Sequence, residues 1–315
     1  MTLLKNKIFK NKPLIVLVVT CIIIALLNNR FLTSGNILTV LRQTSINAVI
    51  ATGMLFVILT GGIDLSVGSV LGFCGAIAAF MVSSGFNVII VVLLTLMLGI
   101  IIGLGNGLLI TAGRLQPFIA TLGTVTLLRG IILVFTQGKP IKLGNTPKSE
   151  IFSKIGTGFL GPIPIPVYIM ILIFIIAFYI LTHTRIGRYI YATGSNEEAT
   201  LYSGIKTDKV KLFVYAFSGM MAALAGILIT ARLGSAQPTA GGGYELDAIA
   251  AVVLGGTSMA GGIGTIAGTA VGALIIGILN NALNLMQVSS YYQDVAKGLV
   301  ILIAVLLDRK QKSSR

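Results

Sequence analysis

Charged residues are scarce in this sequence: they make up 10% of its 315 residues, whereas 55% are hydrophobic. A soluble domain carries about a quarter charged residues, so this chain has too little polar surface to face water. The formal net charge of +14 could suggest a nucleic-acid partner. However, the lysines and arginines stand at the chain ends and between apolar segments, a placement typical of membrane topology. We therefore expect a lipid bilayer and no nucleic acid.

Residue types that carry catalysis and metal binding are also rare. There is one histidine, and the two cysteines, Cys21 and Cys74, lie inside apolar stretches without other ligand-type residues at suitable spacing. The sequence has no HExxH, GxSxG or Walker A motif. We predict no catalytic residue, no metal site, no disulfide and no ATPase site of its own. Energy for uphill transport must then come from a partner or a coupling ion.

Long apolar segments are what the sequence does contain. A bilayer core requires roughly 20 helical residues. Several candidates are short, so we expect about ten membrane-spanning helices and at least eight. The prediction is an all-α, polytopic transmembrane helix bundle that forms one transmembrane domain over residues 1–315. The candidate segments lie at 14–27, 46–60, 66–83, 88–110, 117–136, 163–182, 211–231, 246–257, 263–283 and 293–307.

The distribution of lysine and arginine predicts the orientation. Basic residues cluster before the first segment, in residues 183–210 and at the C-terminal end. Because cytoplasmic loops carry the excess of positive charge, both termini and the loop 183–210 are predicted to be cytoplasmic. The other long loop, residues 137–162, is then external.

Glycine is abundant, with 38 residues, and it recurs at four-residue spacing. Gly99, Gly103 and Gly107 form one such series, which predicts close contact between two membrane helices. Residues 57–62 also resemble residues 251–256, since both read as an apolar run that ends in two glycines. This similarity favours two related halves, although glycine-rich apolar sequence also produces it by chance.

The cytoplasmic loop contains a pattern that predicts a short helix. Ser195 is followed three residues later by Glu198, as in a capping box. The helix would continue through Tyr202 and end at Gly204, a residue suited to the left-handed C′ position. Between two spans, such a helix gives a soluble partner a rigid contact. The alternative is an exposed connector without a binding role.

Asp64 is a carboxylate bounded on both sides by apolar segments, and Ser66 follows it. A charged side chain at membrane depth is costly unless it is paired or faces a cavity, so it is a functional candidate. Asp64 and Ser66 are therefore predicted to belong to the translocation pathway or its gate. Capping of the helix that starts nearby is the other interpretation.

Several amides inside apolar segments have the same two interpretations. Asn47 and Asn106 are predicted to line the pathway, and Asn280 and Asn281 either contribute to it or hold helices together by hydrogen bonds. Asp294 and Lys297 are three residues apart in the last segment, so they are expected to neutralise each other on one helix face.

Four stretches in this order resemble bacterial ribose-type (simple-sugar) ABC permeases. They are GGIDLSVGSVLG at 61–72, GRLQPFIATLGT at 113–124, GRYIYATGSNEEATLYSGI at 187–205, and LDAIAAVVLGGTSMAGGIGTIAGTAVGALIIGIL at 246–279.

The resemblance implies a permease subunit of an importer in the bacterial cytoplasmic membrane. Its partners would be an ABC ATPase, which binds ATP and Mg²⁺, an extracytoplasmic solute-binding protein, and a second permease copy or close homologue. No cofactor is expected in this chain. The residues that would contact the ATPase are Gly194, Asn196, Glu197, Ala199 and Gly204.

Two alternatives remain open for the function. One is an ion-coupled secondary transporter of a small polar solute, and the other is an ABC importer of nucleosides or of a sugar-like signalling molecule. The scarcity of carboxylates in the apolar segments weakens the first alternative. Among possible solutes, a ribose-like sugar is expected first.

Overall fold

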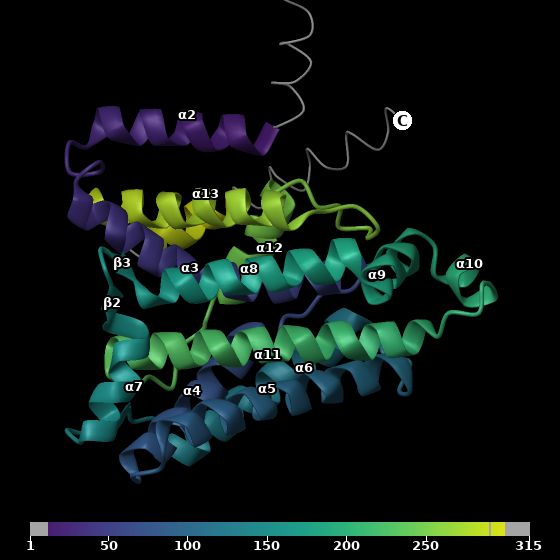
Figure 1. Ribbon diagram of the computed structural model, residues 1–315, viewed down its shortest axis with the longest axis horizontal. Coiled ribbons are helices and arrows are strands. Elements are labelled where there is room, and N and C mark those ends of the chain that lie inside the picture. Colours follow the sequence, from purple (N-terminus) through teal and green to yellow (C-terminus); the bar gives the residue numbers. More distant parts are fainter. Residues whose placement is uncertain (1–11, 290, 300–315) are drawn as a thin grey trace, which may run out of the picture.

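The structure, a computed structural model, describes residues 12–289 and 291–299, most of which are helical. The helices lie side by side as an elongated bundle (Figure 1). The short helices α9 and α10 project from one end of the bundle, and α7 with the short strands β2 and β3 lies at the other end (Figure 1). The expected all-α bundle is therefore confirmed in its general architecture.

The elements follow one another along the chain as a helical series interrupted by short strands. The helices are α2 (Lys12–Leu27), α3 (Ser34–Leu59), α4 (Val67–Ser83), α5 (Val88–Thr111), α6 (Pro117–Thr136), α7 (Pro147–Thr157), α8 (Ile165–His183), α9 (Arg185–Ser195), α10 (Glu197–Tyr202), α11 (Thr207–Leu233), α12 (Tyr244–Leu254) and α13 (Ile266–Leu285). The strands are β1 (Ile141–Lys142), β2 (Phe159–Leu160), β3 (Ile163–Pro164) and β4 (Ser235–Ala236). Residues 291–299 are also helical.

Six helices in the described part of the chain are long and apolar enough to cross a membrane, namely α3, α5, α6, α8, α11 and α13. Residues 13–27 and α4 are shorter apolar helices. Every predicted segment from 14–27 to 263–283 coincides with a helix. The tenth is described only to residue 299.

Two predicted boundaries are wrong because hydropathy underestimates helices with polar turns. The helix predicted from residue 46 begins at Ser34, and the helix predicted from residue 211 begins at Thr207. Arg42, Gln43 and Thr44 interrupt the apolar run of α3 without interrupting its helical backbone. Apolar composition therefore located the helices better than it located their ends.

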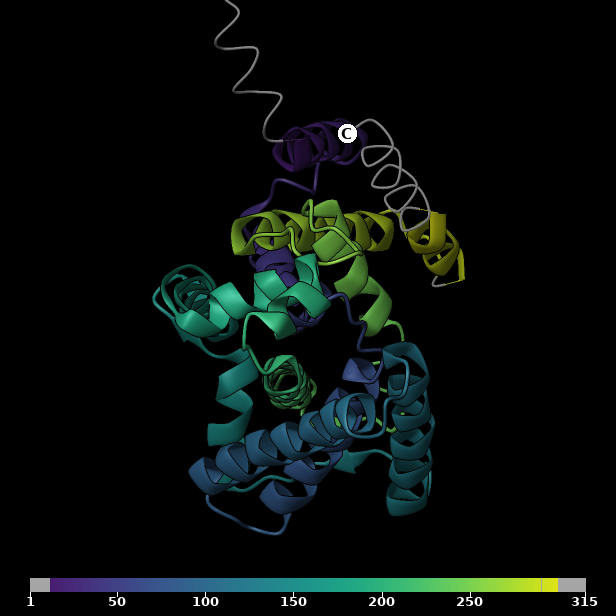
Figure 2. The ribbon, with the colours of Figure 1, turned by 90° about the vertical axis from the view of Figure 1, so that its right-hand side faces the viewer.

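Helix α11 forms the centre of the bundle, and in a view roughly along its axis the other helices surround it (Figure 2). Its closest neighbour is α5, whose glycines face it. A Cβ atom at Gly99 would collide with the carbonyl oxygen of Gly219, and one at Gly103 with that of Tyr215. The glycine series therefore lets two helix backbones touch, as predicted.

The predicted external loop, residues 137–162, is more ordered than its composition suggested. It contains β1, α7 and β2; β1 pairs antiparallel with β4, with Ile141 opposite Ala236, and β2 pairs with β3. Helix α7 begins with a capping box in which Thr146 and Ser149 exchange hydrogen bonds. This local signal was present in the sequence and was overlooked.

Between β4 and α12 the chain turns back into the bundle without helical structure. Gly241 meets the backbone of Gly68, so the first turns of α4 and α12 lie together. Arg129 on α6 donates hydrogen bonds to the carbonyl oxygens of Ala240 (2.6 Å) and Pro238 (3.3 Å). Irregular backbone inside a membrane protein requires such partners, which gives Arg129 a structural role.

Candidate functional site

Helices α9 and α10, together with the turn to Gly204, form a projection at one end of the bundle, here called the hook (residues 185–204). Helix α9 starts after Thr184, whose hydroxyl accepts a hydrogen bond from the Gly187 N–H (3.2 Å). Helix α10 starts after Asn196, whose side-chain oxygen accepts from the Ala199 N–H (2.9 Å). Gly204 then reverses the chain with φ of 84°, where a side chain would be strained.

The predicted short helix is confirmed, but its predicted cap is wrong by one residue. Asn196, not Ser195, caps α10; Ser195 ends α9, and its hydroxyl donates to the Tyr191 carbonyl oxygen (2.9 Å). Helix α9 itself was missed. Asn is at least as good an N-cap as Ser, so the sequence alone allowed α10 to start after either Ser195 or Asn196. Because α9 extends through Ser195, only Asn196 is free to cap α10.

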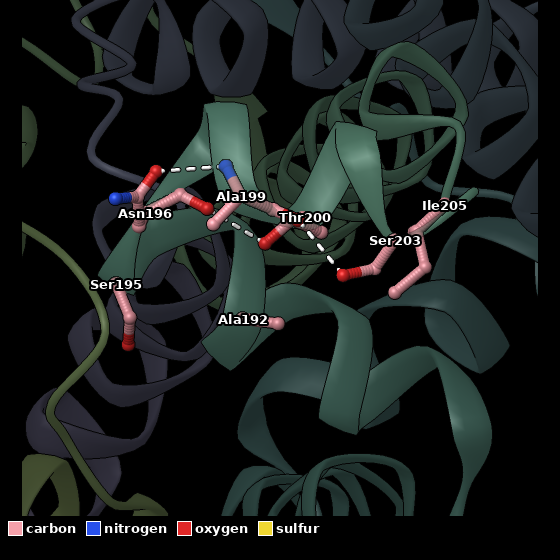
Figure 3. Close-up of a pocket in the computed structure, with 7 residues that line it drawn as sticks. All are labelled: Ala192, Ser195, Asn196, Ala199, Thr200, Ser203 and Ile205. Atoms are coloured by element: carbon pink, nitrogen blue, oxygen red, sulfur yellow. Dashed lines mark hydrogen bonds between the residues drawn. The ribbon is translucent and has the colours of Figure 1, made fainter.

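A shallow groove of about 270 Å³ runs between the two helices of the hook (Figure 3). It is lined by Ala192, Ser195, Asn196, Ala199, Thr200, Ser203 and Ile205. At the tip of α10, the side chains of Leu201 and Tyr202 are 55% and 88% exposed. Apolar groups this exposed beside a groove are typical of a surface that contacts another protein.

The five predicted contact residues have different surroundings. Asn196, Ala199 and Gly204 are exposed, and Glu197 forms an ion pair with Lys211 at the start of α11 (2.5 Å). Because both side chains are partly exposed, with 43% for Glu197 and 21% for Lys211, this pair contributes modestly to stability. It connects α10 to the N-terminal part of α11.

Gly194, the fifth of these residues, packs inward against two other segments. A Cβ atom at this position would overlap the Leu59 carbonyl oxygen and the Gly262 amide nitrogen. The Gly262 N–H in turn donates to the Leu59 carbonyl oxygen (2.9 Å). We call the contact of Leu59, Gly194 and Gly262 the glycine junction. It joins the hook directly to the end of α3 and to the α12–α13 loop.

Tyr191 reinforces the glycine junction one turn earlier on α9. Its hydroxyl donates to the Gly264 carbonyl oxygen (2.8 Å). Burial raises the pKa of the Tyr191 phenol, so the phenol stays protonated and remains a donor. The hook is therefore held to the α12–α13 loop by both a close backbone contact and a side-chain hydrogen bond.

The two similar sequence runs form the same helix ending. After α3, the Gly62 N–H donates to the Val57 carbonyl oxygen (3.1 Å), and after α12, the Thr257 N–H donates to that of Val252 (3.2 Å). Gly61 (φ 78°) and Gly256 (φ 87°) occupy the left-handed position. The sequence similarity is thus structural, but Gly62 corresponds to Thr257 and not to Gly256, so the alignment of the two runs was wrong by one residue.

Asp64, Ser66 and Asn106 meet inside the bundle. The Asp64 carboxylate accepts hydrogen bonds from the Ser66 N–H (3.0 Å) and hydroxyl (2.6 Å) and from the Ser218 hydroxyl (2.8 Å). The Asn106 amide donates to the Ser66 oxygen (2.8 Å), and the Thr124 hydroxyl donates to the Asn106 oxygen (2.6 Å). These five residues, here called the polar cluster, connect the α3–α4 turn to α5, α6 and α11.

Within the polar cluster the hydrogen-bonding groups satisfy one another. Asp64 and Asn106 are each 1% exposed, and both oxygens of the Asp64 carboxylate have partners. In this conformation, the cluster fixes the start of α4. A role of these residues in the pathway stays a prediction. Ser218 and Thr124 were missed because nothing in an apolar helix distinguishes a hydroxyl with a distant partner from any other.

Asn47 lies apart from the polar cluster, in a polar cavity of about 250 Å³. The cavity is formed by α3, the end of α11, α12, α13 and the helical residues 291–299. Asn280 shares this cavity. Asn281 does not, because it exchanges hydrogen bonds of 2.8 and 3.0 Å with Asn36 on α3. Asn281 therefore holds helices together, whereas a pathway role for Asn47 and Asn280 stays a prediction.

The expected pairing of Asp294 with Lys297 is wrong. The Lys297 ammonium lies 3.2 Å from both carboxylate oxygens of Asp247 on α12. The partner on a neighbouring helix thus replaces the partner on the same helix.

In residues 12–289 and 291–299, no cluster of three or more His, Cys, Asp or Glu side chains could hold a metal ion.

This chain is similar to known transport proteins along nearly its whole length. The family described as "Branched-chain amino acid transport system / permease component" matches residues 36–305. The ribose import permease protein RbsC of Haemophilus influenzae is 55% identical over 301 residues, which cover 96% of this chain and 93% of that protein. The ribose import permease protein RbsC of Bacillus subtilis is 53% identical over 302 residues, with the same coverage of 96% and 93%.

A less similar relative is named for a different sugar. The D-allose transport system permease protein AlsC of Escherichia coli is 40% identical over 280 residues, which cover 89% of this chain and 85% of that protein. No solved structure matches the chain.

Proposed function

Because this chain belongs to the sugar-transporting ABC permease family, we propose that its solute is ribose. The chain is a multi-pass membrane protein and the permease subunit of a sugar ABC importer. The choice of ribose is supported by one observation: the relatives that are 53–55% identical over almost the full length are all named ribose import permeases. The relatives named for D-allose and xylose are only 40% and 35% identical.

In the proposed topology the chain crosses the bacterial cytoplasmic membrane about ten times, and both termini lie in the cytoplasm. The positive charges of the hook and of residues 206–211 support this orientation. The strands and α7 then face outward, where a solute-binding protein would deliver the sugar. A second copy of the chain or a close homologue would complete the pathway.

The hook would serve as the contact with the ATPase. Its exposed apolar tip and its groove offer a surface for the partner, and the partner would bind ATP and Mg²⁺. Because Gly194 packs directly against backbone atoms of Leu59 and Gly262, a displacement of the hook would move the end of α3 and the α12–α13 loop together. Nucleotide-driven closure of the ATPases would thereby change access to the pathway.

Uptake by proteoliposomes that contain the permease, ATPase and binding protein tests this proposal. We expect ATP-dependent uptake of ribose, with weaker uptake of D-allose and xylose. The double variant Glu197→Arg/Gly204→Arg should abolish uptake by obstructing the hook, while membrane insertion is retained. Thr157→Arg, at the exposed end of α7 on the opposite side, is the matched control and should retain binding of the ATPase, which the double variant should lose.

Three results would each contradict one part of the proposal. Uptake that persists in the Glu197→Arg/Gly204→Arg variant would exclude the hook as the ATPase contact. Uptake that is abolished by an uncoupler but not by removal of ATP would indicate an ion-coupled transporter. Uptake of nucleosides in preference to ribose would retain the importer and change only its solute.

A further inference from the structure

The polar cavity around Asn47 gathers polar side chains outside the hook and the polar cluster. We call it the amide cavity. Its polar residues come from helices that are far apart in sequence: Gln43 and Asn47 from α3, Asp247 from α12, and Asn280 from α13. A volume of about 250 Å³ is small for a drug-sized ligand and suits a solute of monosaccharide size.

Hydrogen-bonding capacity in the amide cavity is incompletely used. The Asn280 amide donates to an Asp247 oxygen (3.2 Å), but the buried side-chain oxygen of Asn280 has no partner among the described residues. A buried acceptor without a donor is unfavourable. After a rotation of the Asn280 side chain toward the cavity, the hydroxyl group of a solute would supply that donor.

The chemistry of the lining favours a neutral, hydroxyl-rich molecule. Side-chain amides both donate and accept hydrogen bonds, as sugar hydroxyls do. The opposite charges of Asp247 and Lys297 face each other at 3.2 Å, which leaves Arg232 as the remaining charged group of the lining. A single guanidinium can donate to hydroxyls, whereas a phosphate site typically combines several cationic or backbone donors.

The position of the amide cavity fits a solute that arrives from the external side. Arg232 stands in the last turn of α11, and Lys211, which binds the hook, stands near the start of the helix. Roughly 30 Å of helix separates these two residues. Arg232 therefore places one side of the amide cavity near β4, which follows α11 directly, whereas α9 and α10 lie at the other end of the bundle (Figure 1).

Helix α12 connects the amide cavity to the glycine junction. Asp247 lies in the first turn of α12, and the loop that follows the helix carries Gly262, which contacts Gly194 and Leu59. A helix of 11 residues is short and rigid. Movement of the hook would thus be transmitted along α12 to the carboxylate that holds Lys297 and Asn280.

We propose that the amide cavity binds a neutral monosaccharide within the permease, through Asn47, Asn280 and the Asp247–Lys297 pair. This inference rests on the proposed function and adds a solute site to it. The site would hold the sugar after release from the binding protein and before the pathway opens to the cytoplasm.

Uptake and ATP hydrolysis, measured together in the complete transporter, test the site. In Asn280→Leu, the amount of ribose carried per ATP hydrolysed should fall about tenfold, because a buried polar contact to the sugar is lost. The matched control is Asn36→Leu/Asn281→Leu, which removes both amides of a hydrogen-bonded pair outside the cavity. Its ratio of ribose to ATP should equal that of the unmodified protein. An unchanged ratio in Asn280→Leu would overturn the proposal.

A second measurement is independent of transport. In a Cys21→Ser/Cys74→Ala background, Gln43→Cys, which lines the amide cavity without being one of the proposed sugar contacts, is alkylated with a maleimide in the presence of ribose, allose or xylose. The proposal requires at least one sugar to slow alkylation at this position and none to slow it in Tyr202→Cys on the hook. Absence of protection by all three sugars overturns the site. Failure of the unmodified transporter to take up ribose would instead overturn the proposed solute.

Discussion

The hook and the polar cluster are two polar regions of the same bundle, and they are built in opposite ways. Contacts between residues close in sequence form the helix starts of the hook, such as the Asn196 cap on Ala199. In the polar cluster, Asp64 binds Ser218, which is 154 residues away. The hook is exposed and its local contacts exchange with water, whereas the polar cluster is buried. Substitutions in the hook should therefore impair ATP-driven uptake more than they lower the stability of the protein. Substitutions in the polar cluster should mainly lower its stability.

The largest effect is expected for Asp64→Leu. The change leaves the hydroxyls of Ser66 and Ser218 and the Ser66 N–H buried without their acceptor. We expect a loss of about 3–5 kcal/mol in stability, as for other broken buried polar networks. Thermal unfolding in detergent, followed by size-exclusion chromatography, measures it. Asp64→Asn keeps one acceptor oxygen and should be milder; equal stability of Asp64→Leu and the unmodified protein would refute the structural role.

The glycine junction lies between the two regions and should combine both effects. Gly194→Ala forces a methyl group against the backbone of Leu59 and Gly262. Overpacking of this kind costs about 1–3 kcal/mol, and we expect uptake to be lost as well. Gly130→Ala on α6 is the matched control, since no atom lies within 4 Å of the added methyl group. If both variants transport equally well, the junction does not transmit movement.

Asn196→Ala tests the hook alone. Loss of the N-cap costs about 1 kcal/mol, which is enough to unwind a six-residue helix but too little to unfold the bundle. Uptake should fall several-fold while the midpoint of thermal unfolding changes by a few degrees at most. Asn196→Asp restores a capping oxygen and should recover uptake. A large drop in the unfolding midpoint of Asn196→Ala would show that the hook is not independent of the bundle.

The smallest effect is expected from the Glu197–Lys211 pair. Because both groups are partly exposed, their interaction should contribute about 0.2–1 kcal/mol, and it should weaken with added salt. A double-mutant cycle with Glu197→Gln and Lys211→Met, with uptake measured at low and high salt, determines the coupling. Additive effects of the two substitutions would mean that the ion pair does not couple α10 to α11.

The sequence predicted well whatever depends on neighbouring residues. The apolar segments predicted the helices, the glycine series of α5 predicted a close helix contact, and the loop pattern predicted a short helix near residue 197. Its errors also have local causes. Asn196 and Ser195 are both good caps, and the polar turn of Arg42 and Gln43 conceals the start of α3. Each of these sequence patterns predicts a helix correctly, but each is compatible with more than one position for the start of that helix.

Contacts between distant residues could not be predicted in this way. Asn280 and Asn281 are the same residue type at adjacent positions, yet one lines the amide cavity and the other binds Asn36. Lys297 has Asp294 within reach on its own helix, but it binds Asp247. Likewise, Ser218 and Thr124 join the polar cluster without any motif that marks them.

By itself, the sequence determined the solvent of this protein, the approximate place of its apolar helices, and the presence of a short helix in the hook. Hydrophobic segments, helix caps and glycine conformations depend on residues a few positions apart, so they can be predicted from the sequence. The tertiary structure alone decided which polar groups satisfy one another inside the bundle. In a low-dielectric interior each such group requires a partner, and only the packing of the helices determines which partner comes within reach.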